Sequence, residues 1–426
     1  MSALSPPDAA RLAALSDHFG FGLSAEEIDE FVPAVAGTLV ASEAVERFYE
    51  GSAPAAPERP WAAPAPSRNR WGGWYVTTSI NESPQGPLSG RTVAVKDNIA
   101  VAGVPMMNGS RSVDGFVPRR DATVVRRLLD AGATIAGKSV CEDLCFSGAS
   151  FTSQPGPVRN PWDESRNAGG SSSGSAALVA TGEADLALSG DQGGSIRIPS
   201  SFCGIVGHKP THGLVPYTGA FPIERTIDHL GPMARTVADT VLMLTVLAGV
   251  DGMDPRQPSD LDAVEELIAH FARQRIERGA ELSRTVKLVG LSGRYTFEVG
   301  GGKYYAMARQ LVPELRAAYD AALSEHDVLV MPTLPYTATE IPPDDVSLPD
   351  YLATGLSMVG NTAPFDVTGH PACSVPAGLV NGLPAGLMIV GKKFDDATVL
   401  RVAHTYEQAV GGFPAPPVAA TTGSNA

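Results

Sequence analysis

The sequence predicts an α/β domain, with a mixed and twisted β-sheet core covered by helices on both faces, behind a helical N-terminal extension. Three observations support this prediction. After residue 88, short runs of β-branched residues alternate with helical patterns, which is typical of layered α/β folds. Of the 426 residues, 43% are hydrophobic and 18% are charged, so a large core is possible. Before residue 70, apolar residues recur at helical spacing only.

The N-terminal extension is expected over residues 1–70. Apolar residues lie three and four positions apart over 10–19 and 25–49, which predicts two helices. The Pro/Ala-rich run 52–71 follows, and its prolines exclude it from helix interiors and central strands, so it is interpreted as a linker or extended arm. Residues 71–426 are expected to form one α/β domain.

The elements of this domain are predicted from the period of the apolar residues, which is two for strands and 3.6 for helices. Asn381 and Gly382, between two apolar runs, are a hairpin-type turn signal. The pattern predicts strands over 92–95, 134–136, 184–188, 328–331 and 386–390, and helices over 122–129, 175–181, 237–247, 264–280, 304–324 and 397–408.

Net charge and apolar segment lengths exclude two classes of protein. The formal net charge is −14, whereas a nucleic-acid binder needs clustered Lys and Arg to neutralise phosphates. The longest apolar stretch, 240–250, falls well short of the roughly 20 residues that a membrane-spanning helix needs. The start of the chain lacks the basic region and apolar run of a signal peptide. We therefore expect a cytoplasmic protein that binds neither nucleic acid nor membrane.

The four cysteines are too few for a disulfide scaffold and favour a reducing compartment; they are Cys141, Cys145, Cys203 and Cys373. Cys141 and Cys145 are four residues apart, but no second pair and no nearby histidine completes a zinc ligand set. Buried thiols are the better interpretation. No metal and no organic cofactor is expected.

One apparent nucleotide-binding motif is rejected. Residues 132–139, GATIAGKS, match the pattern of a phosphate-binding loop. That motif needs a strand before its first glycine and a helix after its lysine, but here the preceding residues are helix-like, and Thr134 and Ile135 are β-branched. The segment is interpreted instead as a helix that ends at Gly132 and is followed by a strand.

Three other segments place a lysine and two serines at conformationally special positions. Lys96 ends a predicted strand, Ser171 lies in the run GGSSSGS that opens a helix, and Ser195 follows tandem glycines after another strand. A flexible linker would not run straight into the apolar SAALVA, and a simple tight turn would not need all three features. The combination of these three features therefore predicts a catalytic site.

This chemistry is that of a hydroxyl nucleophile. Serine needs a base, and a buried lysine can be that base because desolvation favours the neutral amine. Tandem glycines allow successive backbone N–H groups to converge on an oxyanion. No histidine lies in the three segments, which argues against a Ser-His-Asp triad, and Ser195 is not in a G-x-S-x-G turn.

The sequence resembles the amidase signature family over about residues 74–251, and again from about residue 286 to the C-terminal helix. Ser171 lies 75 residues after Lys96, and Ser195 lies 24 residues after Ser171, as in that family. The matching segments are AVKDNIAVAGVPMMNGS, AGGSSSGSAALVATG, GDQGGSIRIPSSFCGIVGHKPT and DHLGPMARTVAD. The first seventy residues and the segment 121–148 are similar to the enantioselective amidases found alongside nitrile hydratases.

The resemblance implies the amidase signature fold and a Ser–Ser–Lys catalytic triad. Ser195 would be the nucleophile that forms the acyl-enzyme, Ser171, after a cis peptide bond, would relay the proton, and neutral Lys96 would be the base. The implied reaction is hydrolysis of small aliphatic or aryl carboxamides to a carboxylic acid and ammonia, without a cofactor. A homodimer follows by analogy only. The oxyanion hole would be formed by the backbone N–H groups of Gln192, Gly193, Gly194 and Ser195.

Neighbouring residues allow two interpretations. Asp191 and Arg197 flank the nucleophile and are expected to brace its loop by pairing, in preference to contacting substrate. Phe146 and Ile223 match positions that line the acyl pocket in relatives, and both could equally be core residues. Packing is expected for Met106 and Met107, and a turn for Asp228 and His229.

The sequence departs from the family after about residue 258. Relatives continue there with a strand, a helix and a strand, whereas this chain leads directly into VEELIAHFARQRIERGAELS, so a unit of about 30 or more residues is missing near 255–265. Its loss is expected to expose an apolar sheet edge. Two alternatives stay open: a glutamyl-tRNA amidotransferase-type A subunit that works with partner chains, and a catalytically impaired remnant that acts as an interaction protein.

Overall fold

The computed structural model describes residues 7–52, 54–254, 256–257, 278–300 and 302–417. They fall into two compact units, one within residues 1–55 and the other within residues 56–426. The smaller unit contains α1 (Ala9–Phe19) and α2 (Ala25–Ser52), close to the predicted helices. The expected division of the chain at residue 70 stays a prediction.

Short polar residues begin both N-terminal helices. The Asp8 carboxylate accepts a hydrogen bond from the N–H of Arg11 at 2.8 Å, which satisfies one of the unpaired donors at the start of α1. Ser24 and Glu27 form a reciprocal capping box before α2, since each side chain accepts from the N–H of the other. These caps were not part of the sequence prediction.

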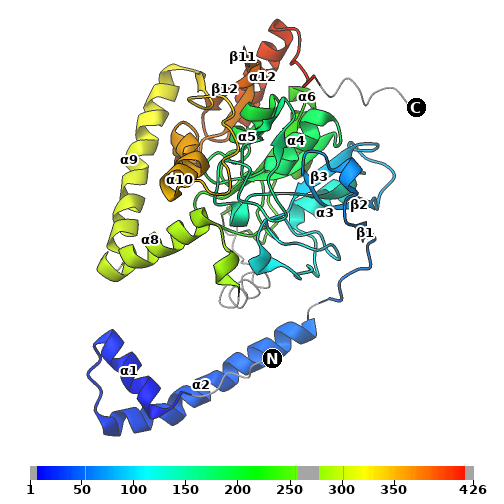
Figure 1. Cartoon of the computed structure of the whole chain (residues 1–426). Coiled ribbons are helices and arrows are strands. Elements are labelled where there is room, and N and C mark those ends of the chain that lie inside the picture. Colours follow the sequence, from blue (N-terminus) through cyan, green and yellow to red (C-terminus); the bar gives the residue numbers. More distant parts are fainter. Residues whose placement is uncertain (1–6, 53, 255, 258–277, 301, 418–426) are drawn as a thin grey trace. The chain divides into compact units, whose positions relative to one another are not determined.

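The larger unit is built on a mixed β-sheet (Figure 1). Its strands are β1 (Trp61–Ala62), β2 (Trp74–Ile80), β3 (Thr92–Lys96), β4 (Thr134–Ser139), β7 (Leu186–Asp191), β8 (Val206–Lys209), β9 (His229–Ala234), β10 (Val328–Pro332), β11 (Ala372–Val380) and β12 (Leu383–Gly391). The order in the sheet is β1-β2-β4-β3-β7-β9-β8-β11-β12-β10. β4 and β7 run parallel to β3, and the other neighbours are antiparallel. A separate pair is formed by β5 (Arg159–Asn160) and β6 (Asp163–Asn167).

The helices of the larger unit agree in part with the prediction. They are α3 (Thr123–Asp130), α4 (Ser173–Thr181), α5 (Arg197–Cys203), α6 (Val237–Leu247), α8 (Arg284–Gly300), α9 (Lys303–Glu325), α10 (Leu348–Leu356), α11 (Ala363–Thr368) and α12 (Asp396–Ala409). α3, α4, α6, α9 and α12 lie where helices were predicted. Most of the helix predicted over 264–280 falls outside the described residues, and α8 was not predicted.

Side chains of β3 alternate between two hydrophobic clusters, one on each face of the sheet. Val93 and Val95 pack with apolar residues of α3, α6 and α12, whereas Ala94 packs with apolar residues of α4. β7 repeats the pattern, with Leu186 in the first cluster and Ala187 in the second. Because successive strand residues point to opposite faces, helices cover both faces, as predicted.

Two local predictions are confirmed and one is wrong. α3 is followed by Gly132 at φ +90° and then by β4, so the apparent phosphate-binding loop is a helix end and a strand. Asn381 and Gly382, both at positive φ, join β11 to β12 as a two-residue hairpin. The turn predicted at Asp228 and His229 is wrong for His229, which begins β9 and pairs with Asp191 of β7. Pairing with a strand far away in sequence overrides the local turn signal here.

An apolar sheet edge is exposed at β10. This strand pairs with β12 on one side, and no other described strand pairs with it. The Val330 side chain on this strand is 54% exposed. The sheet therefore has a free, partly apolar edge, and the expected effect of the shortened segment stays a prediction.

Candidate active site

Lys96 is the last residue of β3, and its side chain is fully buried. The Nζ atom donates a hydrogen bond to the Oγ atom of Ser171 at 2.8 Å and another to the carbonyl oxygen of Gly190 at 3.3 Å. No described carboxylate lies within ion-pair distance of this amine. Two of the three predicted triad residues are thus in direct contact.

The Gly/Ser-rich segment turns sharply just before α4. The peptide bond between Gly170 and Ser171 is cis, as the resemblance implied. A Cβ atom at Gly170 would lie 2.0 Å from the carbonyl oxygen of Ala149, so only glycine fits this approach of two backbones. The next N–H, that of Ser172, donates to the carbonyl oxygen of Ser195 at 3.3 Å. This bond joins the serine-rich turn to the nucleophile loop.

Ser195 lies in the loop between β7 and α5 and is 7% exposed. Its Oγ atom makes no hydrogen bond with any described residue. The side chains of Lys96 and Ser171 are therefore in direct contact, whereas the segments of Ser171 and Ser195 meet through a backbone hydrogen bond from Ser172. Catalytic hydrogen bonds often tighten only when substrate is bound, so a hydroxyl without a partner is compatible with a nucleophile at Ser195.

The four predicted oxyanion donors fall into two groups. The N–H of Gly194 donates to the Asp191 carboxylate at 2.7 Å. The N–H groups of Gln192, Gly193 and Ser195 donate to no described residue. The Thr362 hydroxyl fixes this stretch by donating to the carbonyl oxygen of Gly193. Three N–H groups therefore stay available to an anionic oxygen.

A buried network braces the loop from its inner side. The Asp191 carboxylate accepts from the N–H of Ile196 at 3.0 Å and from the Arg197 guanidinium, also at 3.0 Å. Arg197 donates in turn to Asp366 at 2.7 Å, and all three charged side chains are fully buried. Burial alone would raise the pKa of Asp191, but the Arg197 charge and hydrogen bonds hold it well below its usual range. The expected bracing by Asp191 and Arg197 is confirmed, and Asp366 was missed.

A second buried ion pair, also missed, lies next to Lys96. Lys138 of β4 donates to the Asp97 carboxylate at 2.8 Å. The other Asp97 oxygen accepts from the N–H groups of Met107 and Asn108 at 3.0 and 2.8 Å. Lys138 belongs to the rejected phosphate-loop pattern, and the structure places it in this buried ion pair. No local pattern marks this ion pair, because only the parallel pairing of β3 with β4 brings Lys138 to Asp97.

Cys145 is a buried thiol beside Lys96 and Ser171. Its Sγ atom and that of Cys141 both donate to Oδ1 of Asn108 at 3.5 Å. Burial alone would raise the pKa of the Cys145 thiol, but its contact with the Cys141 thiol and the neighbouring Lys96 and Ser171 side chains lower it. All four cysteines are free and buried, as expected. Because Cys145 lies so close, loss of activity on thiol alkylation would not by itself identify a thiol nucleophile.

Glu142, which lies three residues before this thiol, is a carboxyl group whose charged form is destabilised by burial. One oxygen accepts from the N–H and the hydroxyl of Thr152 at 3.0 and 2.7 Å, and the other has no partner among the described residues. Burial raises the pKa of Glu142 to about 7, and the hydrogen bonds from Thr152 offset only part of this effect.

We expect Glu142→Gln to raise the free energy of unfolding by up to about 3 kcal/mol near pH 8 and to leave it almost unchanged near pH 4. The unfolded carboxyl loses its proton near its ordinary pKa of 4.5, whereas the folded one keeps it up to about 7. The wild type therefore loses stability as pH rises through this window, and the amide variant does not. Denaturant unfolding at both pH values measures the difference. The exposed Glu314→Gln on α9 is the control, and an equal effect of Glu142→Gln at both pH values would contradict this account.

The predicted pocket residues, Phe146 and Ile223, are both half-buried. Ile223 donates its N–H to the Asp228 carboxylate at 3.3 Å. Phe146 packs against a hydrophobic cluster that contains Met106, Val113, Leu144 and Phe221. These contacts suit a core role and a pocket role equally, so the pocket assignment stays a prediction. The expected packing of Met106 and Met107 is confirmed, since both are buried.

No group of three or more His, Cys, Asp or Glu side chains among the described residues is arranged to hold a metal ion. No helix within the same residues has the length and apolar character needed to span a bilayer.

Comparison with known sequences shows similarity over nearly the whole chain. The family model described as Amidase matches residues 43–277 and 275–400. An enantioselective amidase of Rhodococcus rhodochrous is 54% identical over 516 aligned positions, which cover 99% of each chain. Since this chain has 426 residues, at least 90 of those positions have no counterpart in it.

Comparison with solved structures shows the same fold. The A-type chain of the glutamyl-tRNA(Gln) amidotransferase of Thermotoga maritima superimposes with a TM-score of 0.67 at 28% identity, covering 80% of this chain and 90% of that one. The peptide amidase of Stenotrophomonas maltophilia gives a TM-score of 0.62 at 28% identity, covering 78% and 85%.

Proposed function

The chain belongs to the amidase family, and we propose that it hydrolyses small aliphatic or aryl carboxamides to a carboxylic acid and ammonia. The observation that carries this proposal is the 2.8 Å hydrogen bond between the fully buried Lys96 amine and the Ser171 hydroxyl, next to the nucleophile loop. A buried amine that bonds only neutral oxygen atoms is suited to accept a proton. We propose Ser195 as the nucleophile, Ser171 as the relay and neutral Lys96 as the base.

In the first step, the Ser195 Oγ attacks the amide carbonyl carbon. A C–O bond forms, and the hydroxyl proton passes through Ser171 to the Lys96 amine. The carbonyl oxygen becomes an oxyanion, which the N–H groups of Gln192, Gly193 and Ser195 stabilise. Each such donor contributes about 10²- to 10³-fold in rate in comparable enzymes. The N–H of Gly194 acts differently, because its bond to Asp191 fixes the shape of the loop.

In the second step, the tetrahedral intermediate collapses and the C–N bond breaks. The proton returns from Lys96 through Ser171 to the leaving nitrogen, so ammonia departs as a neutral molecule. Water then attacks the acyl-enzyme with the same relay as its base. The carboxylic acid leaves, and the Ser195 hydroxyl is restored.

The two alternatives have less support. The amidotransferase chain of Thermotoga maritima matches 80% of this chain, whereas the Rhodococcus amidase is similar over 99% of both chains. The amidase assignment is therefore favoured. The impaired-remnant alternative rests on the 90 unmatched positions. The Lys96–Ser171 bond and the buried braces of the loop argue against it.

We further propose a cytoplasmic homodimer. Four free, buried thiols suit a reducing compartment. Light scattering of the full chain measures the oligomeric state, and a monomer at micromolar concentration would overturn the dimer.

The test of the proposed function is ammonia release by the purified chain alone, with a panel of aliphatic and aryl carboxamides. Turnover without any partner chain is expected, and it would separate an amidase from an amidotransferase component. If the folded chain releases no ammonia from any member of the panel and forms no covalent adduct with a reactive fluorophosphonate, the impaired remnant would move to first place.

A further inference from the structure

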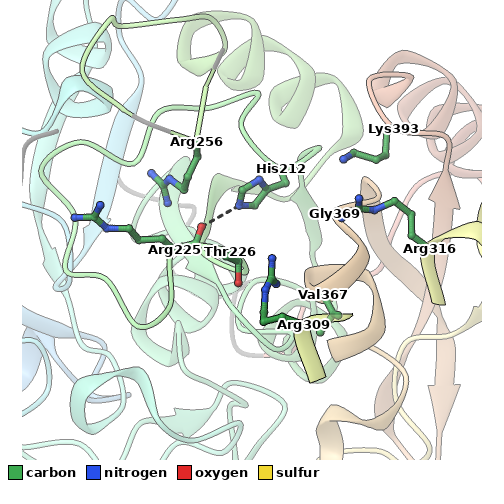
Figure 2. A pocket seen from close by; sticks show the side chains of 9 residues that line it. All are labelled: His212, Arg225, Thr226, Arg256, Arg309, Arg316, Val367, Gly369 and Lys393. Atoms are coloured by element: carbon green, nitrogen blue, oxygen red, sulfur yellow. Dashed lines mark hydrogen bonds between the residues drawn. The ribbon is translucent and has the colours of Figure 1, made fainter. Parts of the chain in front are cut away.

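A cavity of about 300 Å³ lies apart from the triad, and its wall is mostly basic (Figure 2). None of the three triad residues lines it. The basic side chains around it come from α9, from the loop between β8 and β9, from the segment after α6 and from the turn after β12. They are His212, Arg225, Arg256, Arg309, Arg316 and Lys393. Burial lowers the pKa of His212 to about 4, so its ring is neutral near pH 7 and five cations remain. Five cations around one hollow need an explanation in a chain whose net charge is −14.

Two of these cations are directed elsewhere. Arg256 donates to the Asp254 carboxylate at 2.7 Å, and its guanidinium lies 4.4 Å from the centre of the Tyr217 ring. The Arg225 guanidinium points away from the hollow (Figure 2). These two side chains add to the positive field but are not the ones placed to hold a ligand.

Three cations point into the hollow. Figure 2 shows Arg309, Arg316 and Lys393 converging on the space beside His212. Arg316 donates to the carbonyl oxygen of Thr368 at 3.0 Å. Within the described part of the chain, no carboxylate comes within 4 Å of a side-chain nitrogen of these three residues.

The electrostatics of the hollow agree with this geometry. Burial and the nearby charge of Arg316 lower the pKa of Lys393, and Asp320 opposes this effect. The Asp320 carboxylate lies 3.1 Å from Nε2 of His370 and forms no ion pair with Lys393 among the described residues. The described residues therefore compensate the repulsion between the cations of the hollow only in part.

We propose that this cavity binds a small multivalent anion, held by Arg309, Arg316 and Lys393. Guanidinium groups match the paired oxygens of phosphate and carboxylate groups, and an ammonium adds a point charge. A bound anion would remove the repulsion that the cluster now contains. The volume suits a compact ligand, so the chemical class is a phosphate-bearing or polycarboxylate small molecule rather than a polymer.

The test is isothermal titration calorimetry of the full chain with inorganic pyrophosphate and, separately, with citrate, at one ionic strength set with sodium chloride. The variant is Arg309→Gln with Lys393→Gln. Its matched control is Arg294→Gln with Lys303→Gln, which removes two charges from exposed positions on α8 and α9. We expect the pocket variant to weaken binding by at least about tenfold, and the control by less than about threefold.

Each outcome decides the proposal. Binding of pyrophosphate alone assigns the site to phosphate groups, binding of citrate alone assigns it to carboxylates, and both support it. No binding to the wild type, or an equal loss in the control, would overturn it, because affinity would then follow net charge only. Thermal unfolding checks that the variants fold. If the double variant does not fold, the single variant Arg309→Gln takes its place in the titration.

Discussion

Replacing Ser195 by alanine is expected to lower kcat for amide hydrolysis by about 10⁶-fold, which is the size of effect seen when a serine nucleophile is removed. The reason is that no other described hydroxyl both follows the bent glycine loop and lies beside the free N–H groups of Gln192 and Gly193. Steady-state ammonia release measures the loss. Intact mass after treatment with a fluorophosphonate should show one adduct on the wild type and none on the variant.

A buried serine on the neighbouring strand provides the control for this substitution. Ser189 lies in β7, fully buried, and its Oγ atom has no partner among the described residues. Ser189→Ala should therefore keep both the adduct and most of the activity. If Ser195→Ala still forms the adduct, the nucleophile is another residue, and the Cys145 thiol would be examined first.

Replacing Lys96 by methionine is expected to lower kcat by about 10³- to 10⁴-fold, within the range of a lost general base. Methionine fills much of the same buried volume, but it cannot take a proton from the Ser171 hydroxyl. Steady-state rates of ammonia release measure this loss, and thermal unfolding checks that the variant folds.

Lys209→Met is the matched control for this change. Lys209 is also a fully buried lysine at the end of a strand, β8, and it donates to the carbonyl oxygens of Pro210 and His370 at 3.2 and 2.7 Å. Its substitution should reduce stability but leave kcat within a few-fold. A loss of less than tenfold in Lys96→Met would mean that another group is the base.

The three proposed triad residues stand out in the sequence because their signals are local. Lys96 ends a β-branched run, Ser171 lies in a glycine-rich turn, and Ser195 follows tandem glycines, so each can be recognised from a few neighbours. Helices and strands with clear periods were predicted for the same reason, as at α9 and β10. The hydrogen bond between Lys96 and Ser171 then needed only that these segments meet.

The residues that support the triad could not be predicted, because their partners are distant in the sequence. Asp366 reaches Arg197 from α11, more than 160 residues away, and Lys138 reaches Asp97 only through the parallel pairing of two strands. The sequence also could not predict which of the four proposed oxyanion donors already makes a hydrogen bond within the protein. Gly194 has φ +133°, and its N–H donates to the Asp191 carboxylate. No sequence pattern specifies this backbone conformation.

The exposed strand β10 lies far across the sheet from the strands that hold the catalytic groups. Lys96 ends β3 and Ser195 follows β7, and the strands β9, β8, β11 and β12 separate β7 from β10. A change at this margin of the sheet would therefore leave the hydrogen bond between Lys96 and Ser171 and the braces of the Ser195 loop in place.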